Sequence, residues 1–161
     1  MNLSRVFPFF QNSRYDFAGS YAALDVAKYI VTKCSVDRVT ISNLQLQKIL
    51  YYVQKDSLQK HNKALFKDEI EAWKFGPVVK EVYDYFCGFG SIPIFYIQLS
   101  ASPLSEEDSK FVDEITEEKR KLKAWNLVAD THQEGKAWDL VYQGGLGYKK
   151  IIPKGLIAEY G

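Results

Sequence analysis

Apolar residues recur at three- and four-residue steps in two stretches near the start of the chain, a spacing that is typical of amphipathic helices. The first stretch predicts a helix over residues 21–34. A second helix is expected to begin near Ser42, because Ser42 and Gln45 can form a capping box, and to end near residues 61–62. Its two faces are expected to differ: Leu46, Ile49, Leu50, Val53 and Ser57 buried, and Lys48, Lys55 and Gln59 exposed.

Residues 69–75 follow a different pattern, in which the side chains alternate between two faces. An alternation of this kind predicts a short strand. The two faces would carry Ile70 and Ala72 on one side, and Trp73 and Phe75 on the other.

The strand is followed by Gly76 and Pro77, which we expect to end it. Pro77 suits the first position of a helix, where its missing N–H costs nothing, so a helix is predicted from Pro77 to about Gly88. Residues 92–99 are expected to form a second short strand or an extended loop, since Pro93 disfavours a central strand.

The C-terminal half contains several further helical patterns. Ser105 and Asp108 can form another cap, and the helix after them has acidic residues at its start and basic residues at its end, as the helix dipole favours. Shorter helical segments are predicted over residues 124–131, 138–142 and 153–160, with a flexible glycine-rich loop over residues 144–147.

These elements together predict a mainly α protein with a small antiparallel β element, an α+β fold in a single compact helical domain. We expect this domain to span residues 19–161 and to be preceded by an N-terminal arm over residues 1–18. The arm could pack its aromatic residues on the domain, on a second copy or on a partner, so monomer and homodimer both remain open; these residues are Phe7, Phe9 and Phe10.

Composition limits the class of protein. A chain of 161 residues with 47% apolar and 25% charged residues is typical of one globular domain. The net charge of +1 argues against a dedicated nucleic-acid binder. No run of about 18 apolar residues and no signal peptide is found, and the two cysteines are too few for a secreted disulfide framework, so we expect a cytoplasmic protein without membrane contact. The aromatic content of 15% suits a binding surface.

The residues predict no catalytic, cofactor-binding or metal site. His61 and His132 lie far apart, as do Cys34 and Cys87, so no local metal-ligand spacing exists. Cys34 lies on an apolar helical face and is expected to be a small buried side chain. The glycines of residues 144–147 lack the lysine and hydroxyl residue of a phosphate-binding loop.

Two segments remain as candidates for binding. The free N–H groups at the expected helix start near Pro77 could bind a carboxylate of a partner. The simpler alternative is that Trp73 and Phe75 only anchor the strand in the core. His132 follows the end of a helix, where capping of the last carbonyls is a simpler role than proton transfer.

The same segments resemble the Panacea domain family, also met as the SocA-like antitoxin or phage-associated domain. The opening helices of that family are similar to residues 24–30 and 44–52 here. Lys80 and Lys123 depart from the usual pattern, where proline and a helix-capping serine are common. The central and late motifs are matched in order by Glu71-Ala72-Trp73, Gly76-Pro77-Val78-Val79, Val82-Tyr83, Thr131-His132 and Trp138.

The resemblance implies an antitoxin that neutralises a cognate toxin encoded beside it by direct binding, without catalytic residues. Some members of the family deliver their toxin to a cellular protease, and others are orphan phage or prophage proteins. Two other roles stay open for this chain: an unknown enzyme that uses His132, and a nucleic-acid-binding regulator. The second would need a basic face formed by Lys119, Arg120, Lys121, Lys123, Lys149 and Lys150.

The expected partner-binding surface follows from these motifs and from the strand that contains Trp73. Its candidate residues are Trp73, Phe75, Gly76, Pro77, Val78, Tyr83, His132 and Trp138.

Overall fold

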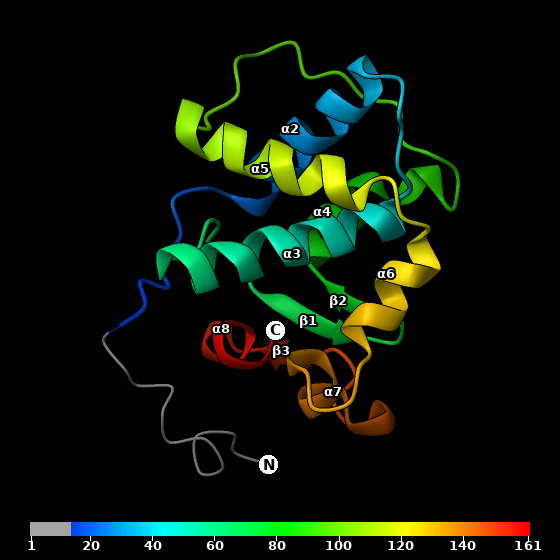
Figure 1. Ribbon diagram of the computed structural model, residues 1–161. Coiled ribbons are helices and arrows are strands. Elements are labelled where there is room, and N and C mark those ends of the chain that lie inside the picture. The colour runs from blue at the N-terminus through cyan, green and yellow to red at the C-terminus, as the bar shows by residue number, and fades with distance from the viewer. Residues whose placement is uncertain (1–13) are drawn as a thin grey trace.

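The longest helix, α3 (Asn43–His61), runs through the middle of the molecule in the computed structural model, which describes residues 14–161 (Figure 1). The predicted capping box is confirmed, because the Ser42 side chain accepts a hydrogen bond from the Gln45 N–H and the Gln45 side chain bonds the Ser42 N–H in return. The helix ends at Asn62, whose left-handed backbone allows the chain to turn. The elements that contact α3 include α2 (Ala23–Val36), α4 (Lys80–Phe86), α5 (Glu106–Lys119), α6 (Ala124–Thr131), α8 (Lys154–Tyr160) and the strand β2 (Gly76–Val78).

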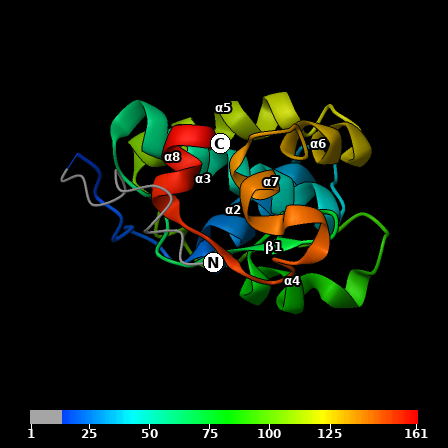
Figure 2. The same cartoon turned by 90° about the horizontal axis from the view of Figure 1, so that it is seen from below.

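The other helices surround α3 in two layers. Helices α2 and α5 cover one side, and the small sheet with α7 and α8 covers the other (Figure 1). Seen from below, α7 and α8 lie beside each other in orange and red (Figure 2). Within residues 14–161 the predicted mainly helical fold is confirmed, with these bounds: α2 (Ala23–Val36), α4 (Lys80–Phe86), α5 (Glu106–Lys119), α6 (Ala124–Thr131), α7 (Ala137–Tyr142) and α8 (Lys154–Tyr160).

The sheet is antiparallel with the order β2-β1-β3, and its strands are β1 (Ile70–Trp73), β2 (Gly76–Val78) and β3 (Ile151–Ile152). The predicted helix start at Pro77 is wrong, because Pro77 lies in β2 opposite Ala72 and the helix begins only at Lys80. Ala72 directs both its N–H and its carbonyl toward residues 149–150. Pro77 therefore loses no ladder hydrogen bond through its missing N–H, which is the position in a sheet where proline is tolerated.

The segment over residues 92–99 is an extended loop rather than a strand. The N–H groups of Ile94, Tyr96 and Gln98 donate inward to the Ile41 carbonyl and to the Ser35 and Thr32 hydroxyls, in that order. The intervening apolar side chains are exposed on the surface: Phe95, Ile97 and Leu99.

Residues 14–18, the described part of the predicted arm, lie along the domain. Asp16 exchanges backbone hydrogen bonds with the turn after α3, at Asn62 and Ala64, and the Tyr15 hydroxyl donates to Glu159 on α8 at 2.7 Å. The expected contacts of the arm's phenylalanines fall outside the described residues, since Phe7, Phe9 and Phe10 precede residue 14.

Candidate functional site

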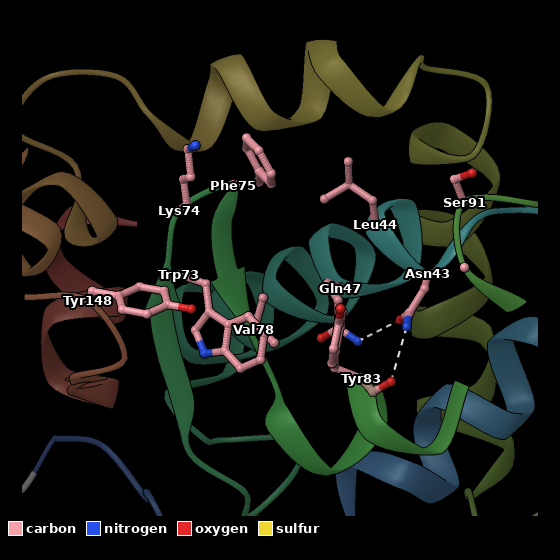
Figure 3. A pocket seen from close by; sticks show the side chains of 11 residues that line it. Asn43, Leu44, Gln47, Trp73, Lys74, Phe75, Val78, Tyr83, Ser91 and Tyr148 are labelled. Carbon is pink, nitrogen blue, oxygen red and sulfur yellow. Dashed lines mark hydrogen bonds between the residues drawn. The ribbon is translucent and has the colours of Figure 1, made fainter. Parts of the chain in front are cut away.

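A surface cavity of about 460 Å³ opens between the β1–β2 hairpin, the start of α3 and helix α4 (Figure 3). We call it the hairpin groove. Four of the eight candidate residues line it, and seven further residues complete it. The candidates are Trp73, Phe75, Val78 and Tyr83, and the others are Asn43, Leu44, Gln47, Lys74, Gly90, Ser91 and Tyr148.

Aromatic rings form much of the groove. Trp73 lies centrally, with the ring centroid of Tyr83 at 4.9 Å and that of Tyr148 at 6.4 Å. Phe75 packs edge-on against Trp125 of α6 at 5.3 Å. The outer rings are accessible to solvent: Phe75, Trp125 and Tyr148 are 46%, 60% and 50% exposed. The alternative that Phe75 only anchors the strand in the core is therefore wrong, since about half of its surface faces solvent.

The base of the groove is fixed by two amide side chains one helical turn apart on α3. The Asn43 amide donates to the Tyr83 carbonyl at 3.2 Å, and the Gln47 amide donates to Asn43 at 3.0 Å. The Gln47 side-chain oxygen accepts the Val79 N–H at 2.9 Å. The helix start expected near Pro77 lies instead at Lys80, and the Val79 N–H just before it is already paired with Gln47.

Lys48 lies beneath the hairpin. The expectation that its side chain is exposed is wrong. It is fully buried, and its ammonium donates to the Pro77 carbonyl at 2.9 Å. A Cβ at Gly76 would lie 2.7 Å from the Lys48 Cε, so glycine leaves the space that this side chain occupies. Desolvation lowers the pKa of Lys48 to about 7. None of the ion pairs recorded within residues 14–161 involves Lys48.

The remaining candidates, His132 and Trp138, belong to a ring stack behind the hairpin. The His132 and Trp138 rings are parallel with centroids 3.7 Å apart, and Tyr142 stacks on Trp138 at 4.4 Å. The Trp138 indole N–H donates to the Trp73 carbonyl at 2.9 Å, which ties the stack to β1. Trp138 is 5% exposed, so it supports the groove without lining it.

His132 terminates α6 through its backbone, whose N–H donates to the Val128 carbonyl. Its ring Nε2 is buried without a hydrogen-bond partner within the described residues, so the ring does not cap a carbonyl. Burial and then the nearby Lys48 charge lower the pKa of His132. Cys34 is buried in the core as expected.

The eight candidates therefore divide into two groups on either side of the hairpin. Trp73, Phe75, Val78 and Tyr83 line the groove. Gly76, Pro77, His132 and Trp138 support it from behind and below, where Gly76 and Pro77 are buried. The sequence reasoning missed Asn43, Gln47, Tyr148 and Trp125. Only Asn43 and Gln47 carried a detectable signal, since they are polar, four residues apart and in line with the apolar stripe of the helix.

Residues 14–161 can also be assessed for metal ligands and for membrane-spanning helices. No group of three or more histidine, cysteine, aspartate or glutamate side chains there could hold a metal ion. Among the described helices, none has both the length and the apolar character needed to cross a membrane.

Comparison with known proteins identifies the family to which the chain belongs. The family described as antitoxin SocA-like, Panacea domain, matches residues 46–139, a range that contains the hairpin, α6 and the ring stack up to Trp138, and the chain belongs to this family. Among curated proteins, Antitoxin SocA of Caulobacter vibrioides (strain NA1000 / CB15N) is 30% identical over 146 residues, which cover 81% of this chain and 78% of that protein. No solved structure matches the chain. The expected family is thereby confirmed.

Proposed function

We propose that this protein is an antitoxin that neutralises a cognate toxin by direct binding through the hairpin groove. Membership of the antitoxin SocA-like family supports a toxin as the partner. The observation that carries the choice of surface is the exposure of Phe75 and Tyr148 in the lining of one cavity, with the exposed Trp125 packed against Phe75 beside it. Large aromatic side chains at a cavity are typical binding anchors, because they bury much surface with few rotatable bonds.

The mechanism we propose is occlusion. A specific protein interface covers on the order of 800 Å² on each partner. The hairpin groove with Trp125 on its rim offers a fixed centre for such an interface, because Asn43 holds α4 and Gln47 holds the end of the hairpin against α3. A toxin surface seated there would be withheld from its own target. Delivery of the bound toxin to a cellular protease is compatible with this arrangement, and no catalytic step by the antitoxin is needed.

A nucleic-acid-binding role has weaker support from the charges of the proposed basic face. Lys119 pairs with Glu118 and lies over the Tyr52 ring, and Arg120 pairs with Asp37. These two cations are therefore already engaged within the protein, which reduces the charge available for phosphate contacts.

The test is growth rescue with the gene that lies beside the one for this protein. We expect the neighbouring protein alone to arrest growth, and co-expression of the wild-type antitoxin to restore it. Phe75→Ala should lose rescue while remaining folded. Phe95→Ala is the matched control, since Phe95 is 65% exposed but does not line the groove.

A harmless neighbouring protein would contradict the antitoxin role and favour an orphan phage or prophage protein. Equal rescue by Phe75→Ala and Phe95→Ala would instead keep the antitoxin role and reject the hairpin groove as the toxin-binding surface.

A further inference from the structure

We propose that the hairpin groove recognises an acidic segment of the toxin, in which an apolar side chain enters the cavity and neighbouring carboxylates meet two lysines at its rim. The inference rests on the proposed function for the identity of the partner. The chemistry of the segment is argued from the groove itself.

The first observation is the charge of the groove lining, which is basic, although the Glu71 carboxylate beside it accepts the Trp73 indole N–H at 2.7 Å. Among its eleven lining residues there is one lysine and no acidic residue. The ammonium of that lysine, Lys74, lies 5.4 Å from the ring centroid of Phe75. A second lysine, Lys149, lies 5.1 Å from the ring centroid of Trp73 and 5.4 Å from that of Tyr148. Two positive charges thus stand directly over the aromatic walls.

The second observation is that both lysines lack a carboxylate partner. Lys74 and Lys149 are exposed, and neither takes part in the ion pairs found within residues 14–161. Lys80, the next lysine along the hairpin, is by contrast paired with Asp84. A cation held over an apolar wall becomes partly desolvated when a partner covers it, so an incoming carboxylate would be favoured and an incoming cation rejected.

The third observation concerns the edge of β2, which excludes recognition by strand addition. The outward carbonyl of Pro77 accepts the Lys48 ammonium, and the Val79 N–H donates to Gln47. An added strand would need these backbone groups for its own hydrogen bonds. The partner segment must therefore be recognised through its side chains, an apolar one in the cavity and charged ones at the rim.

A single-stranded nucleic acid is the other anionic partner that aromatic and basic side chains can bind, through base stacking and phosphate contacts. The central ring of the groove is unsuited to base stacking, because Tyr83 packs against Trp73 and Lys149 lies over it. The amides of Asn43 and Gln47 are also engaged within the protein, so they offer no ready hydrogen bonds to a base edge. These contacts favour a polypeptide.

The experiment uses a phage-displayed library of random twelve-residue peptides panned against the full-length protein. We expect the enriched sequences to combine an aromatic or aliphatic residue with two or more nearby acidic residues. A selected peptide should bind about tenfold more weakly to a Lys74→Glu/Lys149→Glu variant, since both charge contacts become repulsive. The control variant is Lys67→Glu/Lys121→Glu, which changes the same charge at two exposed lysines that do not line the groove.

Several results would overturn the inference. These are no enrichment, enrichment of neutral or basic peptides, equal weakening by the groove and control variants, or displacement of the peptide by an oligothymidylate that binds more tightly. Growth rescue separates this inference from the proposed function. Rescue that survives Lys74→Glu/Lys149→Glu but not Phe75→Ala would reject the acidic segment and keep the antitoxin. If acidic peptides bind as expected but the neighbouring protein does not arrest growth, the preference for an acidic segment would be kept and the antitoxin role rejected.

Discussion

The two sides of the β1–β2 hairpin are built from adjacent residues but differ in nearly every physical respect. The groove side exposes aromatic rings and two lysines that form no ion pair within residues 14–161. The opposite side buries Lys48, Gly76 and the His132–Trp138 stack. The comparison teaches that one short motif performs two tasks: its buried half fixes the geometry, and its exposed half is available to a partner. Substitutions on the two sides should therefore have separable effects.

The largest expected effect belongs to the buried side. Gly76→Ala should lower the free energy of unfolding by about 4 kcal/mol, because the new Cβ meets Lys48 and Thr131 within 3 Å at a backbone φ of +107°. Denaturant unfolding measures the change. Gly88→Ala is the control, since nothing lies within 4 Å of its added Cβ, and it should change stability little. Similar losses in the two variants would contradict the tight packing described for Gly76.

The second prediction concerns the pH dependence that the buried amine imposes. The folded pKa of Lys48, about 7, lies below its unfolded value, so the unfolded state binds more protons between pH 7 and about 10. The unfolding free energy contributed by Lys48 should therefore rise by about 3 kcal/mol as pH increases from 7 to 10. Chemical unfolding of wild type and Lys48→Met at several pH values isolates this contribution.

The comparison with Lys48→Met is needed because Cys34 opposes the trend. Burial raises the pKa of the Cys34 thiol, so its contribution falls over the upper part of the same range. That contribution is present in both proteins and cancels in their difference. A stability difference that does not change with pH would show that the Lys48 amine is not desolvated as described.

The third prediction belongs to the exposed side. Phe75→Ala should weaken toxin binding by about 2 kcal/mol, a typical loss for a central aromatic anchor, while it changes the free energy of unfolding by less than about 1 kcal/mol. Calorimetric titration with the purified toxin and thermal unfolding measure the two quantities. A large loss of stability with no specific loss of binding would place Phe75 on the structural side of the comparison.

The smallest effect is expected where neither side of the hairpin is touched directly. Ser42→Ala removes the cap at the start of α3 and should lower stability by about 1 kcal/mol. Binding to the groove should be unchanged, although Asn43 and Gln47 lie in the first turns of the same helix. A strong binding defect in this variant would show that the groove geometry depends on the cap. Effects on stability and on binding would then not be separable.

Local patterns were enough to predict the helices, and the reason is physical. The Ser42 and Gln45 capping box and the apolar stripe of α3 are satisfied by residues within one or two turns. Lys48 was misplaced because α3 is covered on nearly all sides, so its polar face is buried as well. Pro77 was misplaced because its environment is set by pairing with Ala72 and by α3. These are long-range contacts that a local pattern does not contain.

The groove was predictable only in part for the same reason. Trp73 and Phe75 stood out as aromatic residues in one short motif. Tyr148 and Trp125 reach the groove from segments fifty or more residues further along the chain, just before the two-residue strand β3 and at the start of α6. A strand of that length has too few positions for its alternation to be recognised in the sequence.

The space shared by Gly76 and Lys48 has an evolutionary consequence. A homologue that keeps lysine at position 48 has room for only a hydrogen atom at position 76, so the two positions are coupled in the set of sequences that can fold. In homologues with a shorter residue at position 48, a Cβ at position 76 would no longer meet the Lys48 side chain. Only the preference of the +107° backbone for glycine would then remain. Covariation between these two positions is therefore a property that a family-wide alignment should display.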